Sequence, residues 1–503
     1  MTRQDIVRCR WSSDDDADRF TVDDPSTGQP WVVVQGGGAP EVDRALRAAR
    51  VAQRSWSRRP VAERSQYLLQ AARAVREHAD ELAELEAREV GKPLGQARLN
   101  DLPAAVSIFE FFAGVMHDLP SSARASADML DVTVLAPYGV VAGIIPFNWP
   151  PIHAAGKIAP ALAVGNAVVV KPPEQAPMTI LRIVELLQDV LPDDVVHALP
   201  GGSAAGAALV SHPLVGKLSF TGAPATGSAV LRAAADNLTP AVMELGGKNA
   251  MIVFADADLD AAVATAVDGG FFNQGEACTA ASRLLVERPV YETFLARFGP
   301  AVARLRVGAS LEPGTHVGPL VTAAQQRSVL DHLALGRREG ARVVAEAALP
   351  EAAHLAGGFY VAPTVFADVR PDMRIAREEI FGPVVTVIPF DTEDEAVTIA
   401  NDTDFGLVGS VFTGDNARAL RVADGLDVGI VTVNNYDRRP NGTPFGGVKH
   451  SGFGREHAKE TLAEFGYSKT VRLPVGQIPS PRWSAVAEVL VVSGQKGGSA
   501  CAG

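Results

Sequence analysis

The sequence predicts an α/β fold in which helices cover parallel sheets, and the order of apolar runs along the chain carries this prediction. Continuously apolar runs at residues 140–145 and 167–170 alternate with helical patterns such as residues 178–190. A strand that is buried on both faces has no polar side, so it reads as one apolar run. The alternation therefore indicates βαβ units.

Composition sets the class of protein. The chain has 503 residues, which is enough for two or three domains with large cores. Hydrophobic residues make up 47% and charged residues 21%, which excludes a disordered chain or a fibre. The formal net charge of −12 is poorly suited to binding nucleic acid or an anionic membrane surface.

The N-terminal region is predicted to be mainly helical. Pro40 is suited to a first helical turn, and Val42, Leu46 and Ala49 follow on one stripe. A longer helical pattern covers residues 61–89, after which glycines and prolines end the region.

The rest of the chain alternates strands with helices. Further apolar strand patterns recur in two groups, at residues 195–199 and 217–220 and then at 250–254, 283–287, 341–344, 384–389 and 429–433. The second group predicts a second α/β domain over residues 247–450.

The three cysteines, Cys9, Cys278 and Cys501, are too few for a disulfide framework, so we expect a reducing compartment and a cytoplasmic protein. The first residues lack an apolar stretch long enough for a signal peptide. The most apolar region, residues 139–170, is broken by prolines and predicts core strands and turns, not a membrane span. Residues 497–503 are small and are expected to be disordered.

Cys278 is a candidate nucleophile. Gly275 permits a sharp turn just before it, and Ala277 and Ala280 leave room around the sulfur. A lone cysteine is usually a small buried hydrophobe, and thiol reactivity needs surroundings that favour the thiolate. The local sequence leaves both interpretations open.

Two polar residues interrupt apolar surroundings. Glu244 lies between apolar neighbours, where burial raises the pKa of a carboxyl and makes it a candidate base; the alternative is an ion pair with Lys248. Asn148 lies between Pro146 and Pro150, and a rigidly held amide can stabilise an oxyanion. The alternative for Asn148 is a structural loop amide.

Two turns are suited to a dinucleotide. Residues 220–227 follow a strand and open a helix, where backbone N–H groups attract anions. Lys171 and Glu174 follow the strand that ends at Val170, in a position to bind ribose hydroxyls. Neither turn has the G-x-G-x-x-G spacing, so each alone is weak evidence.

Eight motifs follow one another in a highly specific order. In chain order they read PFNWP, VVVKPPEQAP, FTGAPATG, MELGGKNA, FFNQGEACTAASR, EEIFGPVV, NDTDFGL and PFGGVKHSGFGRE. Together they resemble the aldehyde dehydrogenase superfamily, in its NAD(P)-dependent hydrolytic branch, from Phe20 to Leu473. The resemblance implies a Rossmann-type cofactor domain, a second α/β catalytic domain and a small β oligomerisation arm.

The resemblance also divides the chain into these parts. It implies an NAD-binding domain at residues 1–118 and 138–246, a catalytic domain at 247–450, an oligomerisation arm at 119–137 and 463–474, and a C-terminal tail at 475–503. A homodimer or homotetramer is expected by the same analogy.

For catalysis the resemblance implies that Cys278 is the nucleophile, Glu244 the general base and Asn148 an oxyanion donor, with Lys171 added to the catalytic group. The thiolate attacks an aldehyde, hydride leaves for the nicotinamide, and Glu244 activates the water that hydrolyses the resulting thioester. No metal is expected, because the redox chemistry belongs to the cofactor. Lys248 is expected to orient Glu244 or nearby backbone.

For the cofactor the resemblance implies a site lined by Ile144, Ile145, Pro146, Phe147, Lys171, Glu174, Gly202, Gly206, Phe220, Thr221, Gly222, Ala223, Thr226, Leu245, Gly246, Gln325, Glu379 and Phe381. Lys171 and Glu174 are assigned to the adenosine ribose, and Glu379 with Phe381 to the nicotinamide ribose. Glu174 repels a 2′-phosphate, so NAD is expected over NADP. Relatives often carry serine at position 223, so backbone amides must replace its hydroxyl near the pyrophosphate.

The predicted substrate pocket contains Trp149, His153, Gly156, Ala277, Thr279, Arg438, Arg439 and Phe445. Gly156 lies where relatives often have a bulky aromatic residue, which predicts a wide tunnel. Arg438 and Arg439 either face water or bind a carboxylate, since arginine matches carboxylate geometry. The sharper hypothesis is a polar or anionic aldehyde.

Two alternatives remain from the sequence. One is a relative that passes the thioester to coenzyme A, against which Glu244 argues because such enzymes tend to lack a water-activating base. The other is a non-catalytic binding protein on the same fold, against which the joint presence of Cys278, Glu244 and Asn148 argues.

Overall fold

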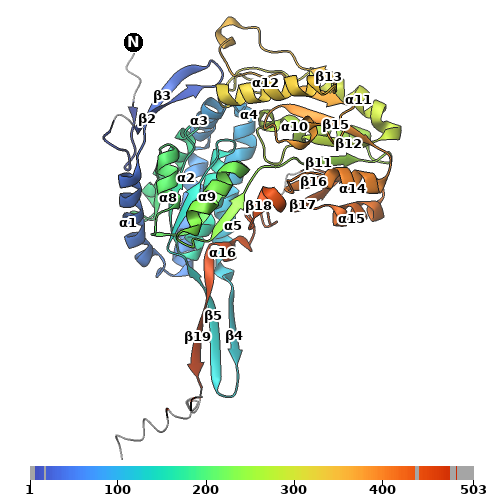
Figure 1. Cartoon of the computed structure of the whole chain (residues 1–503). Helices are drawn as coiled ribbons and strands as arrows, with labels where there is room; N and C mark the ends of the chain where they lie inside the picture. Colours follow the sequence, from blue (N-terminus) through green and yellow to red (C-terminus); the bar gives the residue numbers. More distant parts are fainter. Residues whose placement is uncertain (1–5, 16–17, 437–440, 476–482, 484–485, 487–503) are drawn as a thin grey trace, which may run out of the picture.

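The computed structural model describes residues 6–15, 18–436, 441–475, 483 and 486. Two α/β halves lie next to each other and a narrow three-stranded arm projects from one of them (Figure 1). The predicted α/β class with parallel sheets is confirmed. The predictions for Arg438, Arg439, Cys501 and most of the tail concern residues outside the described ranges.

The first sheet has six strands, in the order β18 (Gly452–Phe453), β10 (Ala241–Glu244), β9 (Val215–Thr221), β6 (Val140–Ile144), β7 (Ala167–Lys171) and β8 (Val196–Ala198). Only the short β18 is antiparallel to its neighbour. Along β7, Val168 and Val170 pack into one core cluster, and Ala167 and Val169 into another. Burial on both faces explains the unbroken apolar run.

Helices cover both faces of this sheet. One face carries α2 (Val61–Glu77), α3 (Ala79–Val90), α5 (Leu102–Val115), α6 (Pro150–Val164) and α7 (Met178–Val190). The other carries α1 (Ala39–Trp56), α8 (Ser203–Val210) and α9 (Pro224–Ala235). A small sheet of β1 (Ile6–Val7), β3 (Gln29–Gln35) and β2 (Arg19–Asp24) lies at the edge.

One helical segment among the described residues, Leu94–Asp118, has the length and apolar composition of a membrane span. Half of its most apolar 18-residue stretch is buried within the protein. It comprises α4 (Leu94–Gln96), a π turn (Ala97–Asp101), α5 and a 3₁₀ turn (Met116–Asp118). Phe109 and Phe112 are fully buried against the first sheet's helices. Packing in the core thus accounts for its apolar character.

The second sheet has seven strands, in the order β13 (Arg342–Glu346), β14 (Thr364–Ala367), β15 (Val384–Phe390), β12 (Arg283–Glu287), β11 (Ala250–Val253), β16 (Val408–Phe412) and β17 (Ile430–Val433). Only β13 is antiparallel to its neighbour. Helices α10 (Leu259–Phe271) and α11 (Arg288–Ala303) cover one face, and α12 (Ala323–Arg338), α14 (Glu393–Asn401) and α15 (Asn416–Gly425) cover the other.

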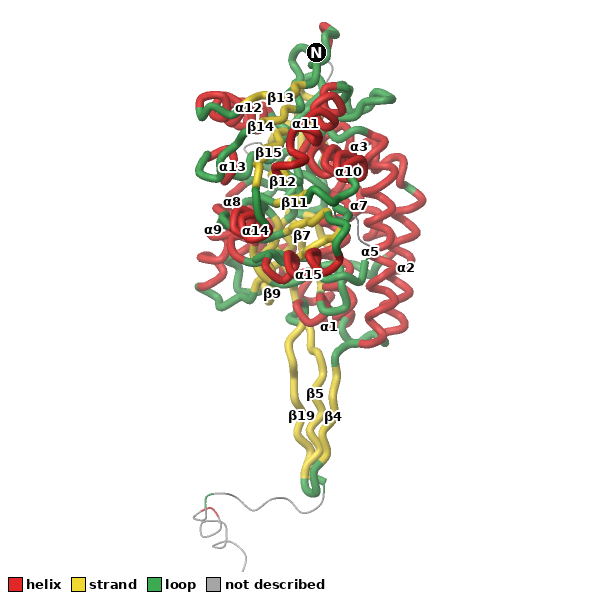
Figure 2. Tube along the Cα trace, turned by 90° about the vertical axis from the view of Figure 1, so that its right-hand side faces the viewer, coloured by secondary structure: helices red, strands yellow, loops and turns green. Residues whose placement is uncertain are grey.

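The arm consists of β4 (Ser121–Ala125), β5 (Met129–Pro137) and β19 (Gly466–Pro474), all antiparallel. Figure 2 shows it extending away from the helices of the body. These strands lie within the segments predicted as an oligomerisation arm, and Val134, Tyr467 and Val471 expose apolar side chains on it. Its role in assembly stays a prediction.

The predicted domain boundary after residue 246 falls between β10 and β11, which belong to different sheets. As a division into domains it stays a prediction. Residues 451–462, which the prediction assigned to no part, supply β18 and the start of α16 (Thr461–Glu464). A short helix, α13 (Arg374–Arg377), and 3₁₀ turns at Phe272–Gly275, Ala353–Leu355 and Lys449–Ser451 complete the fold.

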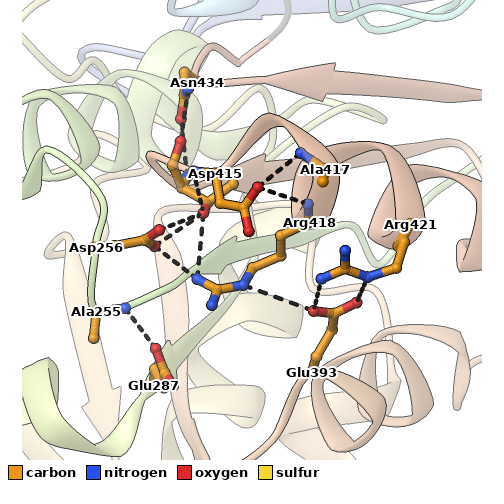
Figure 3. Close-up of polar contacts among 10 residues, drawn as sticks. Ala255, Asp256, Glu287, Glu393, Asp415, Ala417, Arg418, Arg421 and Asn434 are labelled. Atoms are coloured by element: carbon orange, nitrogen blue, oxygen red, sulfur yellow. Dashed lines mark hydrogen bonds and ion pairs between the residues drawn. The ribbon is translucent and has the colours of Figure 1, made fainter.

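A network of exposed charges, called the surface network below, fastens α14 and α15 to the second sheet (Figure 3). Its members are Asp256, Glu393, Arg418 and Arg421. Arg418 donates to Asp256 at 2.8 Å, and Arg421 donates two hydrogen bonds to Glu393, each of 2.8 Å. Asp415 caps α15 by accepting from the backbone of its first turn.

Candidate active site

Three of the four predicted catalytic residues line one cavity of about 200 Å³. Asn148 lies between β6 and α6, Glu244 ends β10, and Cys278 lies in the loop after α10. The cavity is lined by Pro146, Phe147, Asn148, Thr221, Gly222, Ala223, Glu244, Leu245, Gly246, Cys278, Gln325, Glu379 and Phe381. Each of these lining residues was predicted for the catalytic or the cofactor site.

Glu244 is 2% exposed, and neither carboxylate oxygen has a nitrogen or oxygen donor among the described residues. Burial, together with the charge of Glu456, raises its pKa to about 8, while the Cys278 side chain and the charge of Lys157 oppose the rise. A carboxyl with this pKa accepts a proton near neutral pH far more readily than an exposed one. Its position and pKa suit a general base.

Cys278 is 7% exposed in a loop fixed by neighbouring backbone. Gly275 before it has φ +71, and a Cβ there would lie 2.2 Å from the carbonyl oxygen of Gly382, so only glycine fits. The Asn249 amide donates to the carbonyl oxygens of Cys278 and Ala280 at 2.8 and 2.9 Å. Asn249, which was not predicted from the sequence, holds this loop in place from the position just before β11.

Asn148 is 2% exposed. Its Nδ2 donates to the carbonyl oxygen of Glu276 at 3.1 Å, which leaves a second N–H on the same nitrogen. The backbone carbonyl oxygen of Asn148 accepts hydrogen bonds from Lys92 Nζ and from Asn273 Nδ2, both at 3.0 Å. The amide is therefore held at both its backbone and its side chain.

A buried ion pair that the sequence analysis missed lies behind Glu244. Lys157 Nζ donates to Glu456 at 3.0 Å and to the hydroxyls of Thr221 and Ser219 at 2.7 and 3.2 Å. Both charged side chains are at most 2% exposed. The lone lysine in the apolar segment 150–164 was the available signal, because a fully buried lysine needs a partner.

The expected role of Lys248 is not found. Its Nζ is buried and has no hydrogen-bond partner among the described residues, Glu244 included. Burial and the charge of Arg283 lower its pKa to about 7, while Glu379 and Glu378 oppose this. Lys248 thus lies in the electrostatic field of Glu379 rather than that of the candidate base.

Glu379 occupies a glycine cradle. Its Oε1 accepts from the Gly247 N–H at 2.9 Å, and a Cβ at Gly246 would lie 2.0 Å from Oε2. Burial raises its pKa to about 7. Beside it, the ring of Phe381 packs edge to face against the ring of Phe147, with 5.8 Å between the ring centroids.

A second group of predicted cofactor residues gathers at the end of β7 and the start of α8. Glu174 Oε1 would lie 2.8 Å from a Cβ at Gly202, and the Lys171 side chain passes 3.5 Å from the Cβ position of Gly206. Burial lowers the pKa of Lys171, and Glu174 opposes this. Lys171, predicted for both sets, lies with the cofactor group and does not line the Cys278 cavity.

The remaining predicted cofactor residues lie around these two groups. Ile144 ends β6 and Ile145 follows it, Phe220 packs against Gly222, and exposed Thr226 lies in the first turn of α9. The Gly222 N–H already donates to the Glu244 carbonyl oxygen at 3.1 Å. Anion contacts at this turn therefore fall to the other first-turn amides.

A second cavity, of about 460 Å³, opens on the other side of the cysteine loop. Three of the predicted substrate residues, Trp149, Ala277 and Thr279, line it. Because Asn148 and Cys278 line the first cavity, the segments 148–149 and 277–279 separate the two.

His153, Gly156 and Phe445 are not among the residues that line this cavity, and their place in the substrate pocket stays a prediction. A Cβ at Gly156 would lie 3.1 Å from Cε1 of His457, so an imidazole from a distant segment fills the space that the glycine leaves. Phe445 packs against the same imidazole, at 5.7 Å between ring centroids. His457, which the sequence analysis missed, lines the cavity in their place.

Comparisons with known proteins agree with this geometry. A family model described as "Aldehyde dehydrogenase family" matches residues 11–471. The chain is 50% identical to "Aldehyde dehydrogenase citD" of Monascus ruber over 485 residues, covering 96% of this chain and 97% of that protein. It is 45% identical to an aldehyde dehydrogenase of Didymella fabae over 491 residues, with 97% and 99% covered.

Among solved structures, a betaine aldehyde dehydrogenase from Staphylococcus aureus in complex with NAD⁺ superposes with a TM-score of 0.89. It is 35% identical, and the match covers 93% of each chain.

Proposed function

The chain belongs to the aldehyde dehydrogenase family, and we propose that it oxidises a polar aldehyde to the carboxylic acid through a thioester on Cys278, with NAD as the electron acceptor. One observation carries the proposal. The Cys278 side chain, the buried carboxyl of Glu244 and the Asn148 amide line the same cavity.

The residues present fit NAD. Glycines at positions 202 and 246 leave room for the carboxylates of Glu174 and Glu379, and a Cβ at either glycine would collide with them. Carboxylates at these two places suit the hydroxyls of the two riboses. NAD supplies the acceptor for the two electrons that the aldehyde loses.

Cys278 performs the first step. Its thiolate attacks the aldehyde carbon to form a thiohemiacetal, and the second N–H of Asn148 Nδ2 stabilises the oxyanion. Loss of hydride from the former aldehyde carbon leaves a thioester on the sulfur.

Glu244 performs the second step. As a carboxylate it takes a proton from water, and the hydroxide attacks the thioester carbon. The carbon–sulfur bond breaks, the carboxylic acid leaves and Cys278 returns as thiolate. In the buried ion pair near Glu244, the charge of Glu456 raises the pKa of Glu244 and the charge of Lys157 lowers it.

The larger cavity supports a polar substrate. Its lining combines Trp149, Phe272 and Tyr436 with the carboxylates of Asp101 and Asp268. The anionic form of the hypothesis rests on Arg438 and Arg439, which lie outside the described residues.

A panel of aliphatic, aromatic and carboxylated aldehydes with NAD tests the proposal. We expect NADH release without coenzyme A, and Cys278→Ala should reduce it by roughly 10⁴-fold. Release only when coenzyme A is added would support the acylating alternative, and no release with any aldehyde would support a binding protein.

Assembly and location are proposals as well. The exposed apolar side chains of the arm support a homodimer or homotetramer joined through it. Cys9 and Cys278 are thiols in the structure, which agrees with a cytoplasmic location.

A further inference from the structure

Asn273 lies in an unusual turn that leads into the cysteine loop. It has φ +51 and ψ +41, Gln274 follows with φ +46, and Gly275 continues with φ +71. Non-glycine residues rarely adopt left-handed conformations, and asparagine tolerates them best. Two in succession, both fully buried, indicate that the surroundings hold this turn in place.

The Asn273 side chain ties two distant loops together. Its Nδ2 donates one hydrogen bond to the Asn148 carbonyl oxygen at 3.0 Å and one to the Glu276 carbonyl oxygen at 2.9 Å. Asn148 Nδ2 donates to that same Glu276 oxygen at 3.1 Å. Two of these hydrogen bonds join the loop of the oxyanion donor to the loop of the nucleophile, which are far apart in the sequence, and the third fixes the Asn273 side chain within the cysteine loop.

This arrangement determines where the Asn148 amide points. A planar amide nitrogen carries two hydrogens, and the Glu276 carbonyl takes one of them. The direction of the other is then fixed relative to Glu276, two residues before Cys278. Catalysis of acyl transfer depends on such fixed donors, since misplacement by about 1 Å costs about 10²-fold in rate.

We propose that Asn273 is a positioning residue that sets the Asn148 amide against the Cys278 sulfur. The inference rests on the proposed mechanism, in which Asn148 stabilises the oxyanion. Asn273 acts only through Asn148 and the Glu276 carbonyl. Lys92 donates to the same Asn148 carbonyl at 3.0 Å, so this oxygen keeps a donor when Asn273 is replaced.

Two variants separate position from folding. Asn273→Gly keeps the left-handed backbone without strain but removes the amide, and Asn273→Asp keeps the shape but places an oxygen against two carbonyl oxygens. We expect kcat to fall about 10- to 100-fold in both, with KM for the aldehyde changed less than about threefold. Alkylation of Cys278 by iodoacetamide should keep its rate, because that displacement forms no oxyanion.

Asn434 offers a control at an exposed position. It is also left-handed, with φ +50, and its side chain also bonds backbone twice, to the N–H and carbonyl of Thr413 at 3.0 Å each. It belongs to the surroundings of the surface network (Figure 3). Asn434→Gly should leave kcat within about twofold of the parent enzyme.

A double-mutant cycle with Asn148→Ala decides between the explanations. If Asn273 acts through Asn148, adding Asn273→Gly to Asn148→Ala should lower kcat less than about twofold. The same loss in both backgrounds, an unchanged kcat in the single Asn273 variants, or a parallel loss of alkylation rate would overturn the inference. If Asn148→Ala alone leaves kcat unchanged, the proposed mechanism fails, and the role of Asn273 fails with it.

Discussion

The surface network and the surroundings of Glu244 use the same kinds of side chain in opposite ways. In the surface network, Arg421 gives Glu393 two hydrogen bonds and holds the pKa of that carboxyl below its usual range. In the cavity, Glu244 has no guanidinium or ammonium partner among the described residues, and burial raises its pKa to about 8.

The difference separates ion pairs at the surface from buried polar groups that are available for a reaction. An exposed ion pair is screened by water and contributes little to stability. A buried carboxyl without a partner costs folding free energy, so it persists where function needs it. Unpartnered buried atoms of Glu244, Asn148, Lys248 and Asn273 gather around the cysteine loop.

The largest effect should come from removing the buried carboxyl. Glu244→Gln should lower kcat about 10²- to 10³-fold, because water loses its general base. In the parent enzyme the active carboxylate forms as pH rises, so kcat should climb through about pH 8 to a plateau. The variant should lose this limb of the pH profile, measured by NADH release from pH 6 to 10.

Glu89→Gln is the matched control for this profile. Glu89 is also fully buried, and burial raises its pKa to about 7, but it accepts from the backbone N–H groups of Met178 and Thr179, away from the cavity. The rise toward pH 8 should remain in this variant. If the rise also remains in Glu244→Gln, another group is the base.

An intermediate effect is expected at the edge of the cofactor site. Glu174→Ala should raise kcat/KM for NADP about tenfold relative to NAD, because the Glu174 carboxylate, which lies next to Gly202, repels a 2′-phosphate. As a control, Asp189→Ala removes the same charge at an exposed position on α7 and should leave the NADP-to-NAD ratio unchanged. Equal ratios in both variants would show that only net charge matters.

The smallest effect is expected in the surface network. Arg421→Ala should shift Tm by no more than about 1 °C and should leave kcat unchanged, because its ion pair with Glu393 is exposed to water and salt. Thermal unfolding at low and high salt measures this. A large fall in Tm that does not depend on salt would mean that the surface network also contributes substantially to stability, which would contradict the comparison.

The sequence predicted the sheets well because buried parallel strands leave a local signature. Each strand of the first sheet from β6 to β9 matches a short apolar run, and the residues that follow them gather at one edge, as parallel strands require. Cys278, Glu244 and Asn148 lie in motifs whose order is readable, and the structure places them in one cavity.

Roles that depend on a partner far away in the sequence could not be predicted from local sequence patterns. The apolar residues around Lys157 indicate a buried lysine, but its partner Glu456 lies 299 positions away and nothing near Lys157 identifies it. Gly156 appeared to widen the pocket because His457, which covers it, arrives from the C-terminal part of the chain. Local patterns describe elements, whereas the identity of a cavity wall depends on which segments meet.

The pairing of β10 with β18 has a consequence for synthesis on the ribosome. Glu244 lies opposite Gly452, so the outer edge of β10 stays unpaired until about 200 further residues have been made. N-terminal parts of a large protein fold first, and an open strand edge is a template for pairing with other chains. A nascent chain that stalls before Gly452 would therefore carry an unsheltered edge beside its proposed base, which makes this late intermediate a natural client for chaperones.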